Sequence, residues 1–410
     1  MAKSVLSILD TDLYKFSMSY AYLTLYPLAE GTFEFTDRNK ESWSDCPEFL
    51  DNIKMELANV ASLRLSEEEK NWCIKHIPYI PASYWEWLST FHFEYDKFEP
   101  SLDENGVFHC RVTDNMHKVT LYEIPMILVF CKVRNDMLKE KGLRINISDA
   151  QRIIEEKVEF ANRNNIPFSE FGTRRRYDST VQEMVDKVIK EKSHTCTGNS
   201  NVYFCMRYGM LPQGTVAHEN IMFHAAVFGY KRANYLTIED WIKVYDGSLG
   251  TALIDTYTTP SFLRTLTRKQ AYLLSGFRQD SGDEYKVGNM IINRLKEFGI
   301  DPKSKVIVFS NALNMDKAKD IYDYFNGRCK VAFGIGTNLT CDPGIEGYSA
   351  ANAVAKLVRC RLSNKDPWEK CIKISDDLGK HMGDDYEFEI AKYALHLKDS
   401  CRIVNFVQMT

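Results

Sequence analysis

Arg278 and Asp280 stand two positions apart in the segment Arg278-Gln-Asp280-Ser-Gly-Asp283, which follows a short apolar run. An arginine offers a fork of N–H donors to phosphate or carboxylate groups. An aspartate accepts hydrogen bonds from sugar hydroxyls or holds Mg²⁺ through its oxygens, and Ser-Gly allows a tight turn close to a ligand. The segment therefore predicts a site for a phosphorylated, hydroxylated ligand. A solvated Asp/Gly turn is the structural alternative.

A second candidate is Gly334-Ile-Gly336-Thr337, which follows the apolar residues 331–333. Such a loop can turn backbone N–H groups and a hydroxyl toward a phosphate. A plain strand-to-loop glycine pair is equally consistent with these residues. The segment is not the dinucleotide fingerprint, because Leu339 stands where its third glycine would be.

Three adjacent cations, Arg174, Arg175 and Arg176, follow an aromatic residue and a glycine in the segment 170–176. Adjacent side chains point in different directions on a helix, so at most two of them can enter one site. A charged helix start at the surface is the structural alternative. RNA binding is another, although one basic triplet in a chain of net charge −4 supports it weakly.

His218 lies beside an acid in the segment 214–219, at the end of a short apolar run. A histidine here could act as a base, or as a nucleophile that accepts a phosphoryl group, although a lone histidine is more often structural. Near the N-terminus, residues 9–15 combine acids with Tyr14 and Lys15. A helix start capped by Asp or Thr is the simpler interpretation of that segment.

The elements that must position these residues show most clearly between residues 250 and 340. Short apolar runs at 251–255, 306–309 and 331–333 alternate with helical stripes at 287–298 and 318–325. Strands separated by helices indicate parallel β/α units, in an α/β barrel or an open doubly wound sheet. In either fold the functional residues lie at the C-terminal ends of the strands, where the polar residues of this region gather.

Other segments are less regular. Residues 118–130 predict a strand or another buried element, and the tryptophans and tyrosines of 72–87 indicate an aromatic-rich helical stretch. Ser148-x-x-Gln151 and Ser179-x-x-Gln182 each resemble a capping box at a helix start.

Composition bounds the function. An apolar content of 44% and a charged content of 26% are typical of a globular protein. The net charge of −4 argues against general nucleic-acid binding. Without a secretory signal or a run of about 20 apolar residues, we expect a cytoplasmic protein that binds no membrane. The eleven cysteines form no C-x-x-C pair and indicate free thiols in a reducing compartment.

Ten segments, in order from Ile8 to Lys380, together resemble nicotinate phosphoribosyltransferase, in the type II phosphoribosyltransferase group. They are ILDTDLYK, LYEIP, EFGTRRRY, GNSNV, GTVAHE, LIDTY, FRQDSGD, VFSNALN, FGIGTNLTCD and KISDDLGK. The resemblance implies an α/β protein with an α+β N-terminal domain and an irregular TIM-like α/β barrel. We expect the N-terminal domain over 1–145, the barrel over 146–345, and a C-terminal segment over 346–410 that packs back on both.

The resemblance also implies a reaction in NAD biosynthesis. Nicotinate and phosphoribosyl pyrophosphate would give nicotinate mononucleotide and pyrophosphate, with Mg²⁺ as cofactor and ATP as co-substrate. ATP hydrolysis would be coupled through a phosphohistidine, here His218. The resemblance further implies a homodimer with active sites shared between subunits.

Each site residue takes an expected role from the same resemblance. Arg175, Arg278 and Asp255 would surround pyrophosphate, with Asp255 as a possible Mg²⁺ ligand. Asp280 would hold ribose hydroxyls, and His218, Asp255, Arg278 and Asp280 form the catalytic set. The substrate-binding set adds Phe171 and a partner subunit's copy of Tyr14, which would stack on the pyridine, and Arg174, which would pair with its carboxylate. It also includes Ser200, Ser310 and Asn311, and the 5′-phosphate loop of Gly334, Gly336 and Thr337.

One position bears on the choice of pyridine. Related nicotinamide enzymes carry an Asp where this chain has Ser200. A carboxylate would repel nicotinate, whereas a hydroxyl can donate to it, so the acid is favoured. Nicotinamide or quinolinate transfer, and a non-catalytic nucleotide- or RNA-binding protein on the same scaffold, stay open as alternatives. Four positions depart from the family's usual residues: Asn199, Asn220, Glu284 and Asn311.

Overall fold

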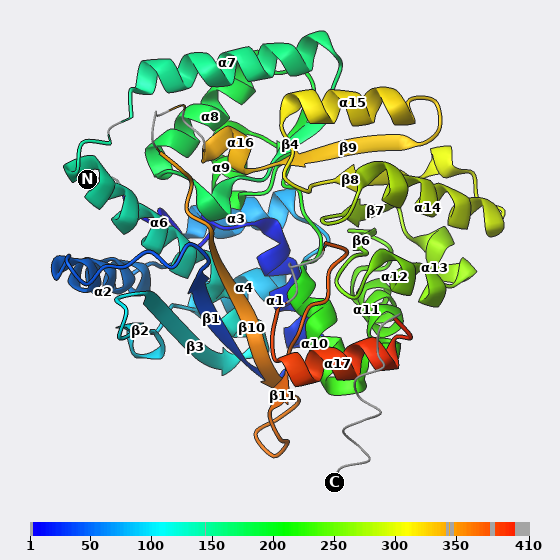
Figure 1. Cartoon of the computed structure of the whole chain (residues 1–410), viewed down its shortest axis with the longest axis horizontal. Coiled ribbons are helices and arrows are strands. Elements are labelled where there is room, and N and C mark those ends of the chain that lie inside the picture. The colour runs from blue at the N-terminus through cyan, green and yellow to red at the C-terminus, as the bar shows by residue number, and fades with distance from the viewer. Residues whose placement is uncertain (1–2, 144, 342–343, 345–347, 378–381, 398–410) are drawn as a thin grey trace.

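The computed structural model describes residues 3–143, 145–341, 344, 348–377 and 382–397. Its strands form two sheets, one antiparallel with five strands and one parallel with six (Figure 1). The chain therefore combines an α+β unit with a parallel α/β unit, which confirms the predicted fold class. Among the described residues, no helix is both long enough and apolar enough to span a membrane.

The antiparallel sheet has the order β11-β10-β1-β3-β2. Two of its strands, β10 and β11, come from the C-terminal segment, and β10 pairs with β1 so that Glu30 lies opposite Arg361. Figure 1 shows the long orange β10 beside the blue β1. The strands are β1 (Glu30–Asp37), β2 (Glu99–Leu102), β3 (Phe108–Asn115), β10 (Ala353–Arg361) and β11 (Glu369–Lys370).

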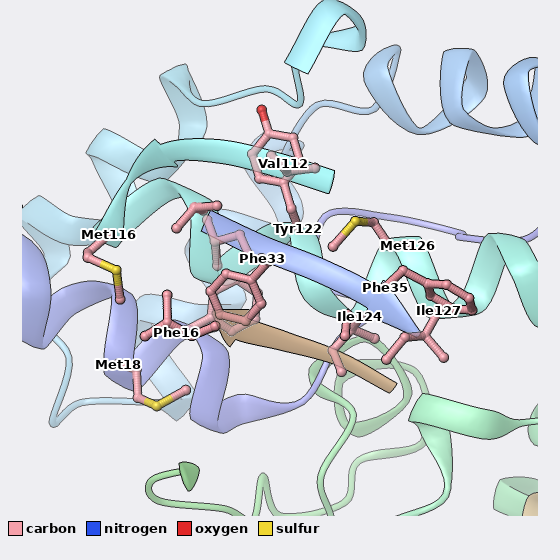
Figure 2. Close-up of a cluster of buried hydrophobic side chains, with 14 of the residues drawn as sticks. Phe16, Met18, Phe33, Phe35, Val112, Met116, Tyr122, Ile124, Met126 and Ile127 are labelled. Carbon is pink, nitrogen blue, oxygen red and sulfur yellow. The ribbon is translucent and has the colours of Figure 1, made fainter. Parts of the chain in front are cut away.

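The helices of this unit cover the sheet and share its hydrophobic core. Figure 2 shows Phe33 and Phe35 of β1 among side chains from α1 and α6, and burying one such side chain contributes about 1.5–3 kcal/mol. The helices are α1 (Leu13–Leu25), α2 (Glu48–Ala61), α3 (Glu67–His76), α4 (Ala82–Thr90), α5 (Met116–Val119), α6 (Glu123–Glu140) and α17 (Asp385–Ala394), with 3₁₀ turns at Tyr95–Lys97 and Thr120–Tyr122.

The segment 118–130 is buried, as predicted, but it is helical and not a strand. It spans the end of α5, a 3₁₀ turn and the first half of α6. Every residue of α6 from Glu123 to Arg134 is buried, so its sequence lacks the one-sided apolar stripe that marks a surface helix. A continuous apolar run does not distinguish a buried helix from a buried strand.

The parallel sheet has the order β5-β4-β9-β8-β7-β6. Its strands follow the alternation expected from the sequence, and most of the following helices pack around them over a second hydrophobic core. The strands are β4 (Phe168–Glu170), β5 (Cys196–Asn199), β6 (Thr251–Leu253), β7 (Gly276–Gln279), β8 (Val306–Phe309) and β9 (Lys330–Ile335). The helices are α7 (Ile147–Arg163), α8 (Ser179–Lys192), α9 (Val202–Tyr208), α10 (His218–Phe228), α11 (Tyr230–Tyr245), α12 (Thr259–Thr265), α13 (Arg268–Leu273), α14 (Glu284–Glu297), α15 (Met315–Phe325) and α16 (Thr337–Thr340), with 3₁₀ turns at Thr173–Arg175 and Pro302–Ser304. Helix α10 instead packs on β10 and joins the first core, and α11 contributes to both cores.

The gap between the two end strands, β5 and β6, is bridged by the irregular segment 211–215. Asn199 of β5 exchanges backbone hydrogen bonds with Leu211 and Gln213. On the other side, the Thr215 hydroxyl donates to the carbonyl of Thr251 in β6 at 2.7 Å. The barrel is therefore closed on this side by loop contacts, and this explains its irregularity.

Both predicted capping boxes are displaced. Helix α7 is capped by Asn146, two residues before Ser148, and Gln151 instead donates to Glu155 on the helix surface. Helix α8 is capped by Asp178, and its Gln182 is buried in a polar network. In each case a neighbouring Asn or Asp, which caps at least as well as serine, takes the position.

Candidate active site

The C-terminal ends of β6, β7 and β8 place their polar residues at one edge of the parallel sheet. Strand β7 pairs with β6 on one side and β8 on the other, in parallel register. Asp255, Asp280 and Ser310 follow these strands directly or within two residues. The predicted convergence of strand ends is therefore present in the fold.

Arg278, Asp280 and Ser310 form a closed hydrogen-bond network. Asp280 Oδ1 accepts from Arg278 Nη2 at 3.0 Å and from Ser310 Oγ at 2.8 Å, and Arg278 Nε donates to Ser310 Oγ at 3.0 Å. Burial raises the pKa of Asp280, but the charge of Arg278 and the hydrogen bond to His218 outweigh burial and hold that pKa well below its usual value. Asp280 is therefore an anion with a fixed orientation.

His218 is the first residue of α10, and its ring reaches into the same network. Nε2 lies 3.1 Å from Asp280 Oδ2 and 2.9 Å from Lys373 Nζ, and Nδ1 lies 2.9 Å from the Thr256 hydroxyl. Burial and the Lys373 ammonium lower the pKa of His218 against the pull of Asp255 and Asp280. A neutral imidazole keeps a lone pair for nucleophilic attack, and Lys373 beside Nε2 can balance the charge of an arriving phosphoryl group.

The carboxylate of Asp255 has an unsatisfied oxygen, which tests whether Mg²⁺ fits. Oδ2 accepts from the Ser281 hydroxyl, whereas the buried Oδ1 has no hydrogen-bond partner among the described residues. Single ligand atoms of His218, Asp255 and Asp280 lie within 4.8 Å of one another. Mg²⁺ prefers carboxylate oxygens to imidazole, so the two aspartates fit this ion and His218 fits less well.

The ring of Phe171 lies between the arginine network and the glycine loop. Arg278 Cζ lies 6.0 Å from the ring centroid. A Cβ atom on Gly334 would come within 2.6 Å of the ring, and one on Gly336 within 2.8 Å of the Phe171 carbonyl oxygen. Both positions therefore require glycine for this close approach, and Thr337 follows as an exposed residue that starts α16.

Asp12 joins two predicted pyridine contacts. It accepts from the Ser200 hydroxyl at 2.6 Å and from the Tyr14 hydroxyl, and its side chain makes no helix cap. In this geometry the Ser200 hydroxyl hydrogen is donated to Asp12, so the contact expected between Ser200 and the nicotinate carboxylate stays a prediction. Arg174 is a cation at this position that could attract a carboxylate ligand. Its guanidinium interacts with Tyr14, Asp12 and Asp280.

In this structure Tyr14 lies beside Ser200 and Gly214 of its own chain. The backbone N–H of Leu13 donates to the carbonyl of Ser200 at 2.8 Å, and the Tyr14 backbone lies within van der Waals reach of Gly214. The expectation that a partner's Tyr14 stacks on the pyridine stays a prediction. The homodimer itself stays a prediction.

Comparison with known proteins agrees with this geometry. Residues 166–398 match the model of the nicotinate phosphoribosyltransferase (NAPRTase) family, and residues 9–130 match the NAPRTase N-terminal domain.

The chain belongs to the nicotinate phosphoribosyltransferase family.

Its relatives match over nearly their whole length. A nicotinate phosphoribosyltransferase of Chromohalobacter salexigens is 36% identical over 95% of this chain and 98% of its own. One of Desulforapulum autotrophicum is 35% identical over 93% and 96%. The crystal structure of the Porphyromonas gingivalis nicotinate phosphoribosyltransferase superposes with a TM-score of 0.93 at 38% identity, over 96% of this chain and all of that one.

The three adjacent arginines of this NAPRTase family member have different surroundings. Arg174 lies near Tyr14, Asp12 and Asp280. Arg175 donates to the carbonyl of Ala353 at 3.0 Å, and burial and Arg174 lower the pKa of Arg175 to about 10. Arg176 is buried and binds Asp10 through two nitrogens. The expectation that at most two of the three can enter the site agrees with this arrangement.

The sequence analysis missed three cations at this site. Burial, together with the charges of Arg38, Lys373 and the two arginines Arg174 and Arg175, lowers the pKa of Lys356 to about 7. Arg38 directly follows β1, and Lys356 lies within β10 of the other sheet. Arg38 and Lys356 are single cations in ordinary strand sequences, so no local motif marks them, whereas Lys373 begins the segment KISDDLGK but takes no role of its own from the resemblance. Only the sheet pairing brings Arg38 and Lys356 to Arg174.

We expect Lys356 to make anion binding by this NAPRTase family member sensitive to pH. With its pKa at about 7 it is mostly neutral at pH 8, and a bound polyphosphate favours the charged form. We therefore expect Lys356 to contribute an uptake of about one proton to pyrophosphate binding at pH 8 and almost none at pH 6, beside any proton that pyrophosphate itself releases. Calorimetry in buffers of different ionisation enthalpy measures this uptake. Lys356→Met should abolish it, and an unchanged uptake in that variant would contradict the assignment.

The four departures from the NAPRTase family's usual residues have structural contacts. Asn199 donates to buried Asp186 at 2.6 Å, and Glu284 at the start of α14 binds Lys317 at 2.7 Å. Two further residues make loop or helix contacts. The His224 ring contacts the backbone carbonyl of Asn220 at 2.7 Å, a contact that any residue at this position supplies, and the Asn311 amide lies 3.5 Å from the carbonyl of Gly282. The substrate role expected for Asn311 stays a prediction.

Proposed function

We propose that the protein transfers the phosphoribosyl group of phosphoribosyl pyrophosphate to nicotinate and releases pyrophosphate. The observation that carries this proposal is a five-cation cluster that reaches the strand-end network, since Lys373 contacts His218 and Arg174 interacts with Asp280. The cluster comprises Arg38, Arg174, Arg175, Lys356 and Lys373. The cluster suits a diphosphate, and the aromatic rings of Phe171 and Tyr14 are of the kind that stack on a flat pyridine. Free thiols at all ten described cysteines support a reducing, cytoplasmic location.

The bond between the ribose C1 and the pyrophosphate oxygen breaks as positive charge develops on the sugar ring, and the pyridine nitrogen then bonds to C1. Catalysis therefore depends on positioning and charge stabilisation. In this proposal the cation cluster holds the leaving pyrophosphate and Asp280 holds the ribose hydroxyls. The Gly334–Gly336 loop with Thr337 receives the 5′-phosphate, and Arg174 pairs with the nicotinate carboxylate. Mg²⁺, held by Asp255 and Asp280, would neutralise part of the diphosphate charge.

ATP hydrolysis is coupled to transfer through His218 in the same proposal. The neutral imidazole attacks the γ-phosphorus, the bond to the ADP oxygen breaks, and water later hydrolyses the phosphohistidine. The cation Lys373, 2.9 Å from Nε2, and the oriented carboxylate of Asp280 support this role. Phosphoryl transfer to His218 does not require the imidazole to touch the ribose–pyrophosphate bond.

Replacing His218 with alanine is expected to remove the acid-labile phosphoryl label and the stimulation by ATP. Phosphoribosyl transfer without ATP should persist, because the imidazole is bonded to Asp280 and not assigned to the breaking bond. Labelling with γ-phosphate-labelled ATP and product formation with and without ATP measure the two effects. Equal stimulation in the variant and the wild type would refute the role.

The assay that tests the reaction itself measures nicotinate mononucleotide formed by purified protein with Mg²⁺, with and without ATP. Failure to form this product would refute the proposal. Competition among nicotinate, nicotinamide and quinolinate for one labelled phosphoribosyl donor distinguishes the related transferases. A non-catalytic nucleotide- or RNA-binding protein would show no turnover and binding that weakens steeply with salt.

A further inference from the structure

A buried ionic network lies next to the active site and takes no direct part in it. Lys15 of α1 is completely buried and pairs with two carboxylates, Glu123 at the start of α6 and Glu219 in the first turn of α10. Thr120 donates to the second oxygen of Glu219 at 2.5 Å. Burying three charged groups costs desolvation free energy unless they are fully paired, so this network lowers the stability of the fold if any of its pairs is lost.

Glu219 directly follows His218, and the two side chains contact different units of the protein. The His218 ring bonds to Thr256 and Asp280, which follow strands of the parallel sheet. Glu219 bonds to Lys15 and Thr120, which belong to the N-terminal α+β unit. The first turn of α10 is therefore fastened to both units through adjacent residues.

The rest of this turn is held by packing, because Asn220 and Ile221 are buried and α10 lies against β10. The N-cap residue of α10 is Ala217, which has no side chain to cap the helix. Contacts with α1 hold the segment before it, because the Ser17 hydroxyl donates to the carbonyl of Thr215 at 2.6 Å and the Ala217 N–H faces Met18 Sδ at 3.4 Å. Through its ion pair with Lys15, Glu219 adds a further contact with α1 on the C-terminal side of His218.

Resting on the proposed role of His218, we propose that Glu219 is a positioning residue, which through Lys15 holds the imidazole in line for phosphoryl transfer from ATP. Tyr14 precedes Lys15, whose Nζ lies 5.4 Å from the Tyr14 ring centroid. Adjacent residues of α1 therefore serve both proposed sites: Tyr14 supplies a ring for the pyridine, and Lys15 contacts the helix that carries His218. Loosening the Glu219 contact displaces His218, while the cation cluster and Asp280 stay in place.

The two carboxylates on Lys15 provide a matched pair of variants. Glu219→Gln and Glu123→Gln each remove one charge from the same ammonium with almost no change of shape, but only Glu219 belongs to α10. For Glu219→Gln we expect the phosphoryl label on His218 and the ATP stimulation to fall about tenfold, and transfer without ATP to stay within about threefold. Glu123→Gln should keep the label and the stimulation within about twofold.

Thermal unfolding of both variants separates positioning from folding. Comparable shifts in Tm with loss of the label only in Glu219→Gln would support the proposal. Equal loss of label in both variants, or no loss in either, would overturn it. Wild-type protein that forms nicotinate mononucleotide but takes up no label would refute the phosphohistidine and this inference, while leaving phosphoribosyl transfer intact.

Discussion

Replacing Asp280 with alanine is expected to lower kcat/KM for the phosphoribosyl donor by about 10³-fold, the largest loss of activity for any single side chain in the site. Asp280 Oδ1 fixes both Arg278 and Ser310, and Oδ2 contacts His218. Removing the carboxylate releases three groups and deletes the predicted ribose contact. Each tenfold loss corresponds to about 1.4 kcal/mol of transition-state stabilisation, so about 4 kcal/mol is at stake.

Steady-state kinetics with the donor varied at saturating nicotinate measure this effect, both with and without ATP. Ser310→Ala is the matched control, because it removes one partner of Arg278 and Asp280 but leaves their ion pair of 3.0 Å. We expect that variant to lose only about tenfold, or about 1.4 kcal/mol, which is near the lower end for hydrogen bonds to charged groups. Equal losses in the two variants would mean that Asp280 acts only by holding Ser310.

The largest loss of stability is expected for Arg176→Ala. Arg176 is 1% exposed and donates to both oxygens of Asp10, to Gln182 and to the carbonyl of Ser4 at 2.7–2.8 Å. Removing one partner of a buried ion pair leaves a charge in a medium of low polarity. The free energy of unfolding should fall by about 3–5 kcal/mol. Arg176→Lys should recover little, since one ammonium cannot reproduce the fork.

The size of this loss should depend on pH through a neighbouring acid. Burial raises the pKa of Glu170 to about 8, and the charge of Arg176 opposes that rise. Below pH 7 Glu170 is protonated, and the charge of Arg176 stabilises it little. Above pH 8 Glu170 is ionised, and the same charge stabilises it more. The deficit of Arg176→Ala, measured by urea unfolding, should therefore grow between pH 6 and pH 9. A deficit independent of pH would place Glu170 outside the influence of Arg176.

The sequence predicts the part of the site that is built from strand ends. Each of Asp255, Asp280 and Ser310 follows a short apolar run, and parallel pairing then brings them together without any further information. The helical segment 118–130 was less predictable, because burial on all sides removes the periodicity that identifies a helix.

Long-range contacts account for the rest of what the sequence left open. Nothing local in residues 9–15 indicates that Asp12 turns away from its own helix to accept from Ser200, 188 positions later. Lys356 and Arg38 reach Arg174 only because β10 pairs with β1. Capping errors at Ser148 and Ser179 have a different cause, since a better capping residue stands one or two positions earlier.

The place of β10 between β1 and β11 bears on how the protein is made. Until residues 353–361 leave the ribosome, β1 is paired only with β3 and presents an open edge of unpaired N–H and C=O groups. At about 5–20 residues per second, the roughly 250 residues between β3 and the end of β10 take about 12–50 s to synthesise. Throughout that interval the exposed edge of β1 can pair with strands of other chains. The yield of folded protein should therefore depend on the translation rate and on the supply of chaperones.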